Sequence, residues 1–179
     1  WCRMIPRSFQ PLAAAVAATS MWACSPSLDW REVRPLDSSV VALFPCKPSG
    51  QERRVLMAGQ PVRLTLLACE AGGLTWSLAL ADMANPAAST ARSSSAGGAA
   101  AANIDATTVE PTALQVRGAT PHPQSARLRL AGHRPDGRAA QMQAAFFTHG
   151  TWVYQVTVLG EQVRAEDADT FFAALRFIA

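Results

Sequence analysis

Cysteines are the residues of this chain whose type and position point most directly to chemistry. Cys24 follows a run of apolar and small residues, and Cys46 and Cys69 each stand in a later apolar segment. A thiol behind such a run is a substrate for lipid attachment, and two thiols in an exported chain can form a disulfide. Cys2 lies upstream of Met4, the expected start of translation, and we expect no role for it.

The N-terminal residues have the three parts of an export signal. A short first region carries Arg7, an apolar stretch follows at 12–23, and small residues stand near its end. The apolar stretch is shorter than the roughly 20 residues that span a bilayer. We therefore predict a removable signal peptide at 1–23, of which 1–3 are an upstream extension.

The sequence Met21-Trp22-Ala23-Cys24 resembles the lipobox of bacterial lipoproteins. Ala23 matches the small residue before the modified cysteine, whereas Trp22 departs from the small residue typical of its position. The resemblance implies that Cys24 receives a diacylglycerol, becomes the first residue after cleavage and is N-acylated, a lipidation of the palmitate type. Several acyl chains anchor a protein firmly, whereas one holds it only marginally. Ser25 in place of aspartate implies the outer membrane, with the protein facing the periplasm.

Two other interpretations of the N-terminus stay open. In the first, an ordinary secretory signal is cleaved next to Cys24, whose thiol is then free or paired. In the second, the chain is cytoplasmic and 12–23 form a packed helix. No residue caps such a helix, and Pro6 and Pro11 interrupt it. Export is therefore the favoured interpretation.

Cys46 and Cys69 are the even pair that a disulfide needs once the chain is exported. Closing the loop between them would stabilise the fold by roughly 3 kcal/mol in the chain-entropy model. The alternative is two independent buried thiols, because free cysteine often behaves as a small hydrophobe. No CxxC spacing supports a redox site.

The charge balance excludes one class of partner. The chain of 179 residues carries a formal charge of +3, which falls to +1 when Arg3 and Arg7 leave with the leader. A nearly neutral protein has no field that attracts nucleic acid, so we expect no nucleic-acid partner. The expected partners are the membrane, through the N-terminal lipid, and another envelope protein.

Titratable residues give little sign of catalysis. The three histidines do not cluster with the cysteines at ligand spacings, so we predict no metal site and no cofactor. Nucleophile elbows, phosphate loops and dinucleotide fingerprints are absent from the sequence. An enzyme would need at least two of five groups to converge in one pocket. These five are His122, His133, His149, Asp136 and Glu70. The simpler interpretation places the histidines in solvated turns.

The sequence pattern of residues 25–82 predicts a tether followed by four strands. Residues 25–38 show no periodicity and are predicted to be a lipidated tether with Cys24, along which Trp30 can dock on the domain. Four strand segments follow, predicted to form an antiparallel meander with a turn at Gly72-Gly73. They are 40–46, 51–59, 62–70 and 74–82. In the last two, alternate residues are expected to face the core, namely Val62, Leu64, Leu66, Ala68, Leu74, Trp76, Leu78 and Leu80.

An Ala/Ser/Gly-rich stretch at 85–106 has the composition of a flexible linker, yet it carries helix signals. Asn85 can cap a helix, Pro86 suits its first position, and alanine is the strongest helix former. We predict a helix over 86–102 with its alanine face on the sheet.

The second half predicts a further sheet and a closing helix. Strands are expected at 114–120, 125–133, 138–147 and 151–159, with Trp152, Tyr154, Val156 and Val158 on one face and a half-wet opposite face. Arg127 and Arg129 are expected to face solvent, or to form a basic stripe. The final segment, 166–178, predicts a helix with Phe171, Phe172, Leu175 and Ile178 as its apolar stripe and Arg176 in its last turn.

This layout resembles the PsbP-like α/β/α sandwich. The matching features are an FP-x-x-P turn (Phe44, Pro45 and Pro48), the paired strands at 60–82, the strand at 150–160 and the closing helix. The chain also looks like uncharacterised exported lipoproteins of Gram-negative bacteria. The resemblance implies a single α+β domain at 39–179, with an antiparallel sheet, a central helix and a C-terminal helix. Members of the wider fold act as binding or assembly proteins without active sites, but a fold does not transfer a function.

Two hypotheses of function follow. The first is an exported, lipid-anchored envelope protein that acts as a non-catalytic binding or assembly module. The second is a periplasmic envelope enzyme, such as a hydrolase, which requires the five titratable groups above to converge.

Overall fold

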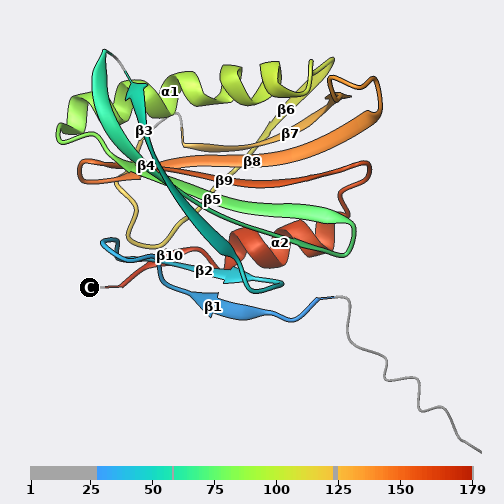
Figure 1. Ribbon diagram of the computed structural model, residues 1–179, viewed down its shortest axis with the longest axis horizontal. Coiled ribbons are helices and arrows are strands. Elements are labelled where there is room, and N and C mark those ends of the chain that lie inside the picture. Colours follow the sequence, from blue (N-terminus) through green and yellow to red (C-terminus); the bar gives the residue numbers. More distant parts are fainter. Residues whose placement is uncertain (1–27, 58, 123–124, 179) are drawn as a thin grey trace, which may run out of the picture.

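The computed structural model describes residues 28–57, 59–122 and 125–178 of the chain. Figure 1 shows a long helix above a large antiparallel sheet, with a shorter helix and a small sheet below it. The expected α+β sandwich is therefore confirmed. The predicted signal peptide at 1–23 and the predicted lipidation site at Cys24 lie outside the described residues.

The large sheet has seven strands, all antiparallel to their neighbours. In spatial order they are β3 (Ser49–Met57), β4 (Gln60–Ala71), β5 (Leu74–Asp82), β9 (Trp152–Gly160), β8 (Ala139–His149), β7 (Ala126–His133) and β6 (Thr108–Thr112). Gly72 and Gly73 join β4 to β5 in a two-residue turn with φ of 61° and 75°. Both values lie in the left-handed region, which glycine enters without strain.

The small sheet has the order β1 (Arg31–Val33), β2 (Val40–Phe44) and β10 (Arg176–Phe177). Two expectations are corrected here. The first strand segment does not join the meander, because β2 pairs with strands from both ends of the described chain instead. Residues 31–33, expected to lie in the tether, form strand β1 of the domain instead. Asp29 N donates to Pro45 O at 2.8 Å, and Trp30 packs edge-on against Trp76 with ring centroids 5.6 Å apart.

Helix α1 (Pro86–Asn103) covers one face of the large sheet (Figure 1). Asn85 caps it through a side-chain oxygen that accepts from Ala87 N, and Pro86 occupies the first turn, as expected. Its buried alanines, Ala96 and Ala100, pack with Ile104 against apolar residues of β7 and β8. The helical interpretation of this stretch is confirmed, and the linker interpretation is wrong.

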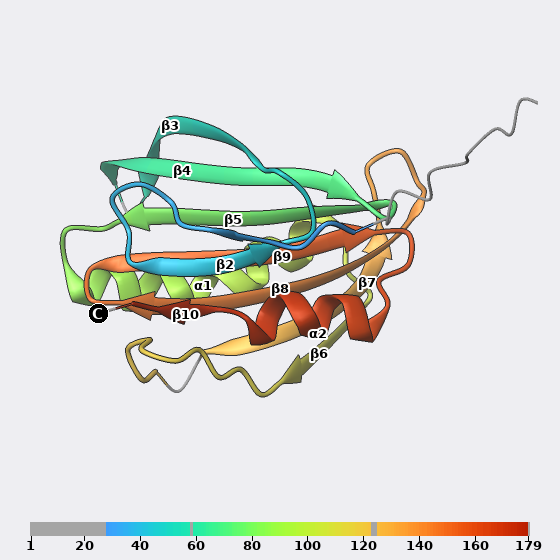
Figure 2. The ribbon, with the colours of Figure 1, turned by 90° about the horizontal axis from the view of Figure 1, so that it is seen from below.

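Helix α2 (Ala165–Ala173) and the small sheet cover the other face (Figure 2). The prediction of a helix through 166–178 is wrong beyond Ala173. Arg176 and Phe177 form strand β10 and pair with Val41 and Val40. Ile178 is 41% exposed and lies outside the apolar stripe. Pairing with the buried strand β2 outcompetes one further helical turn.

The core on the α2 face is built from aromatic rings. Phe171 makes edge-on contacts with Phe44 and Trp76, at centroid distances of 5.2 and 5.3 Å. Phe147 stacks on Tyr154 at 5.2 Å. The four residues of β5 expected to point inward, Leu74, Trp76, Leu78 and Leu80, are all buried in this core.

Two expectations about the strands are wrong, and a third is right only in part. Leu66 on β4 is exposed, while Leu67 and Cys69 on the opposite face pack against the aromatic core. On the face of β9 expected to be half-wet, α1 buries Val153 and Thr157, while Gln155 stays half-buried. The expected strand at 114–120 forms only isolated bridges at Arg117 and Thr120. The strand in this region is β6, which comes before it.

The disulfide is confirmed. Cys46 and Cys69 are bonded, with Cα atoms 6.1 Å apart. The bond joins the segment between β2 and β3 to strand β4, and both cysteines pack against the aromatic core. It therefore fastens the small sheet to the large one.

Candidate binding groove

The five titratable candidates do not form one site. The turn with Asp136 and the adjacent His133 lie at one end of the β7–β8 hairpin, and His149 lies at the other. His133 pairs with Ala139 at the start of β8, and His149 is ten residues further along the same strand. The two histidines are therefore about 30 Å apart along the strand direction. Glu70 is on β4, and three strands separate β4 from β7.

Each of these groups has its own surroundings. Hydrogen bonds from Arg138 lower the pKa of Asp136 below its ordinary value. His149 is not a simple solvated residue, because its ring stacks on Phe177 at 4.2 Å and its Nδ1 lies 2.8 Å from Gly118 O. These contacts give His149 a packing role at the end of β8.

Arg127 is buried, against the expectation that it faces solvent. Its Nε donates to Gln143 Oε1 at 2.9 Å, and its Nη1 lies 2.6 Å from Asp169 Oδ1 on α2. The guanidinium also stands over the Phe172 ring, 4.3 Å from the centroid. Arg127 therefore fixes α2 to the sheet, while Arg129 is exposed. Alternation on β7 correctly places both arginines on one face, but the sequence does not reveal that α2 covers only one of them.

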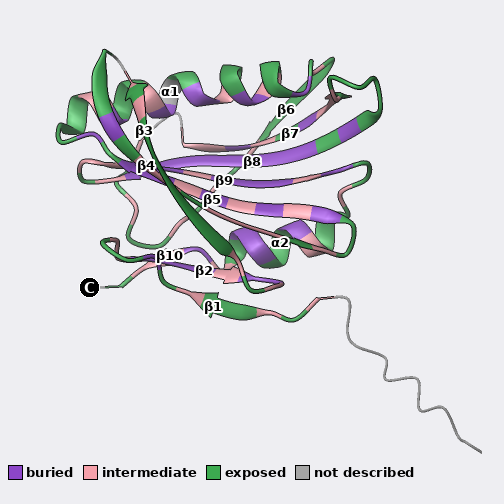
Figure 3. Ribbon diagram, viewed as in Figure 1, coloured by how far each residue is buried: buried purple, intermediate pink, exposed green. Residues whose placement is uncertain are grey.

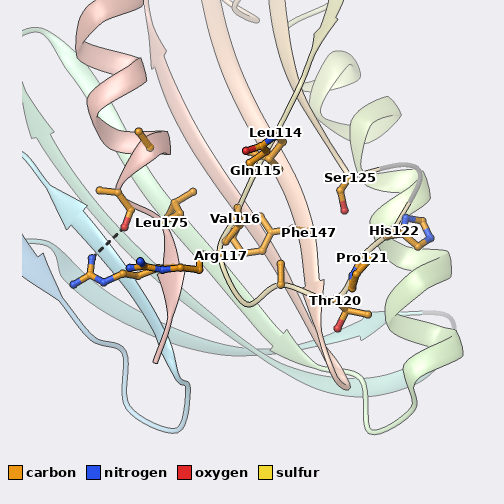
Figure 4. Close-up of a pocket in the computed structure, with 14 residues that line it drawn as sticks. Leu114, Gln115, Val116, Arg117, Thr120, Pro121, His122, Ser125, Phe147 and Leu175 are labelled. Carbon is orange, nitrogen blue, oxygen red and sulfur yellow. Dashed lines mark hydrogen bonds between the residues drawn. The ribbon is translucent and has the colours of Figure 1, made fainter. Parts of the chain in front are cut away.

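A groove of about 860 Å³ lies beside this helix (Figure 4). Its walls are residues 114–122, which follow β6, together with the end of α2 and with β8. The residues that line it are Leu114, Gln115, Val116, Arg117, Ala119, Thr120, Pro121, His122, Ser125, Phe147, Ala173, Ala174, Leu175 and Arg176. In Figure 4 the groove extends from Leu175 at one end to His122 at the other.

The floor of the groove is apolar. Phe147 is 1% exposed and Leu175 is 2% exposed, and both belong to the aromatic core. Leu114 and Val116 pack against the same core. The residues that follow each of them, Gln115 and Arg117, are exposed. The 114–117 segment is therefore extended and alternates between core and solvent, although no strand pairs along its length.

The charged side chains of the groove are basic. Arg117 and Arg176 line it, and no aspartate or glutamate does. Arg176 has partners, because it donates to Ala174 O at 3.3 Å and pairs with Glu32 on β1. Hydrogen bonds from Arg34 and then Arg176 lower the pKa of Glu32. The Arg117 guanidinium makes no hydrogen bond or ion pair with any described residue.

The backbone of the groove wall also has open positions. Within the described part of the chain, the amide groups of Leu114, Gln115 and Val116 donate no hydrogen bond. The segment is held at its far end, where Phe177 N donates to Arg117 O at 2.9 Å and Thr120 N donates to Thr148 O at 2.8 Å. The wall is thus an extended backbone with donors available to a ligand.

Sequence reasoning did not find this groove. Its walls come from three distant parts of the chain, and its lining mixes ordinary apolar and polar residues. The described residues contain no group of three or more His, Cys, Asp or Glu arranged to hold a metal ion. None of the helices in the described ranges has the length and apolarity to cross a bilayer.

Fold and site together define the class of protein. It is an α+β sandwich with a disulfide between its two sheets and an open, basic groove beside its C-terminal helix. Comparison of the chain with protein-family models and with curated proteins finds no match.

Proposed function

We propose that this protein is an exported, lipid-anchored envelope protein that binds a partner in the groove beside α2. The observation that carries the export half of the proposal is the Cys46–Cys69 disulfide. Disulfides persist in oxidising compartments and are rare in the cytosol. The leader at 1–23, inferred from the residues alone, is consistent with that compartment.

The anchor in this proposal is Cys24, acylated and held in the outer membrane facing the periplasm. Leu28 already packs against the aromatic core. The link from Cys24 to Leu28 therefore spans at most about 14 Å when fully extended. Such a short link holds the domain close to the lipid headgroups.

This link also gives the domain an orientation. Leu28 lies against the β4–β5 turn, within 3.2 Å of the position that a Cβ on Gly72 would occupy. The groove residue Phe147 lies in register with Tyr154 on β9, and Tyr154 lies in register with Leu80 on β5. Leu80 is seven residues from Gly73 in the β4–β5 turn, so the groove lies roughly 20 Å along the strands from that turn. The groove is then on the part of the domain remote from the bilayer, where an envelope partner can reach it.

Fractionation of a Gram-negative host that expresses the full chain tests the proposal. We expect the wild-type protein in the outer-membrane fraction, and we expect the Cys24→Ala variant to be lost from that fraction with the Cys46–Cys69 bond intact. Ser25→Ala is the matched control and stays in the outer membrane. Recovery of Cys24→Ala in the outer-membrane fraction would rule out anchoring through this residue.

A further inference from the structure

We propose that the groove binds an extended peptide segment that carries carboxylate side chains, and that Arg117 is the residue that binds a carboxylate. This inference rests on the proposed function as a binding protein. It adds the class of ligand and the residue that selects it.

Charge complementarity selects an anionic ligand. Two arginines line the groove and no acidic residue does, so the local charge favours an anion. Arg176 is already paired with Glu32, which it shares with Arg34, whereas Arg117 has no partner among the described residues and is exposed. A guanidinium binds a carboxylate through two parallel hydrogen bonds, a geometry that lysine does not provide.

The backbone beside Arg117 selects an extended polypeptide. Leu114, Gln115 and Val116 form an extended run whose amide groups donate to no described residue. A peptide can align with such a run through main-chain hydrogen bonds, while its alternate side chains enter pockets or face solvent. Leu114 and Val116, which are half-buried, supply apolar surface for those side chains.

The lining disfavours a small apolar ligand such as a fatty acid. Sites for such ligands are concave and mostly apolar, with few polar groups. Here six of the fourteen lining residues are polar, namely Gln115, Arg117, Thr120, His122, Ser125 and Arg176, so the lining is mixed rather than mostly apolar. A peptide, which presents polar backbone and mixed side chains, matches this lining better than an acyl chain.

Fluorescence anisotropy on the purified full-length protein in detergent tests the inference. The probe is a fluorescein-labelled, C-terminally amidated octapeptide of alternating valine and glutamate, and the comparison peptide replaces each glutamate with glutamine. We expect the glutamate peptide to bind about tenfold more tightly, the effect of one charge-assisted hydrogen bond. Added salt should weaken binding of the glutamate peptide.

Variants locate the effect. Arg117→Gln should weaken binding of the glutamate peptide about tenfold and leave that of the glutamine peptide unchanged. The matched control is Arg53→Gln, an exposed arginine on β3 outside the groove. Because Arg117 is exposed, its substitution should leave the thermal unfolding midpoint unchanged, so a loss of binding is not a loss of fold.

Four results would overturn the inference. In the first, the two peptides bind equally tightly, and in the second, neither peptide binds. In the third, Arg117→Gln and Arg53→Gln weaken binding of the glutamate peptide equally. In the fourth, sodium decanoate binds more tightly than the glutamate peptide and does so through Arg117. The last would replace the peptide with an acyl carboxylate. Anchoring is tested separately, because a protein that fails to be acylated at Cys24 can still bind the glutamate peptide through Arg117.

Discussion

The two faces of the seven-stranded sheet are packed in different ways. On the α2 face, Phe44, Trp76 and Phe171 interlock as edge-on aromatic rings. On the α1 face, small residues such as Ala96 and Ala100 let the helix lie close to the sheet. Figure 3 shows the outer side of α1 exposed and the central strands β8 and β9 mostly buried.

The two faces also differ in their buried polar side chains. Under α1, the hydroxyls of Ser93 and Thr148 are buried without a hydrogen-bond partner, and the Ser125 hydroxyl beside the groove is in the same state. Under α2, the buried Arg127 donates to Gln143, pairs with Asp169 and stands over the Phe172 ring. The α2 face also carries the disulfide and the groove.

The largest expected effect is on the aromatic face. Phe171→Ala removes a side chain that is 0% exposed and should reduce the free energy of unfolding by about 3–5 kcal/mol. Ala100→Gly, at an equally buried position of α1, should cost only about 1 kcal/mol. Urea denaturation measures both. Equal losses would break the contrast between the faces.

The disulfide should rank next. The double variant Cys46→Ala, Cys69→Ala opens a loop of 23 residues and should cost about 3 kcal/mol. Dithiothreitol should destabilise the wild-type protein and leave the double variant unchanged in urea denaturation. If the reductant changes neither protein, the two thiols do not form the bond.

Arg127 should give a smaller loss. Arg127→Met keeps much of the apolar stem but leaves buried Gln143 without its donor, so we expect a loss of about 2 kcal/mol. Asp169→Asn should cost well under half as much, because the Asp169 side chain is 57% exposed and water screens its ion pair. Thermal unfolding of the two variants measures the ranking. A larger loss for Asp169→Asn would contradict the packing role of Arg127.

Tyr154 gives the smallest effect, visible only at high pH. Burial raises the pKa of Tyr154, and a hydrogen bond with Ser38 partly opposes this. In the folded state the Tyr154 hydroxyl therefore stays protonated at pH values above its ordinary pKa of about 10, whereas in the unfolded chain the same hydroxyl loses its proton there. Stability should fall as the pH rises through that window, by up to about 1.4 kcal/mol per pH unit.

Absorbance at alkaline pH can follow this group alone, because the chain contains one tyrosine. The transition should appear only as the protein unfolds, and Tyr154→Phe should remove this part of the pH dependence. A reversible tyrosine transition at its ordinary pKa in the folded protein would show that the ring is not buried.

Local patterns predicted the elements whose signals are short-range. The alternation in 74–82 gave a correct inward face, and Asn85 with Pro86 marked the start of α1. The spacing of the cysteines allowed the disulfide without determining it. These features depend on backbone propensity and on periodicity, which a single sequence carries.

Long-range packing decided what the sequence could not predict. Arg176 and Phe177 have helix-compatible neighbours, and only the presence of β2 draws them into a strand. Arg127 looks like a solvent-facing arginine until α2 places Asp169 and Phe172 beside it. The groove has the same origin, because its walls become neighbours only when three distant segments fold together.

We propose that the chain is exported, acylated and oxidised before its groove meets a partner. Intact mass spectrometry of the protein extracted from membranes tests this most directly. The predicted result is a chain that begins at Cys24, carries acyl chains there and lacks two hydrogens at the Cys46–Cys69 pair. A cytosolic protein that retains residues 4–23 and has reduced thiols would contradict it.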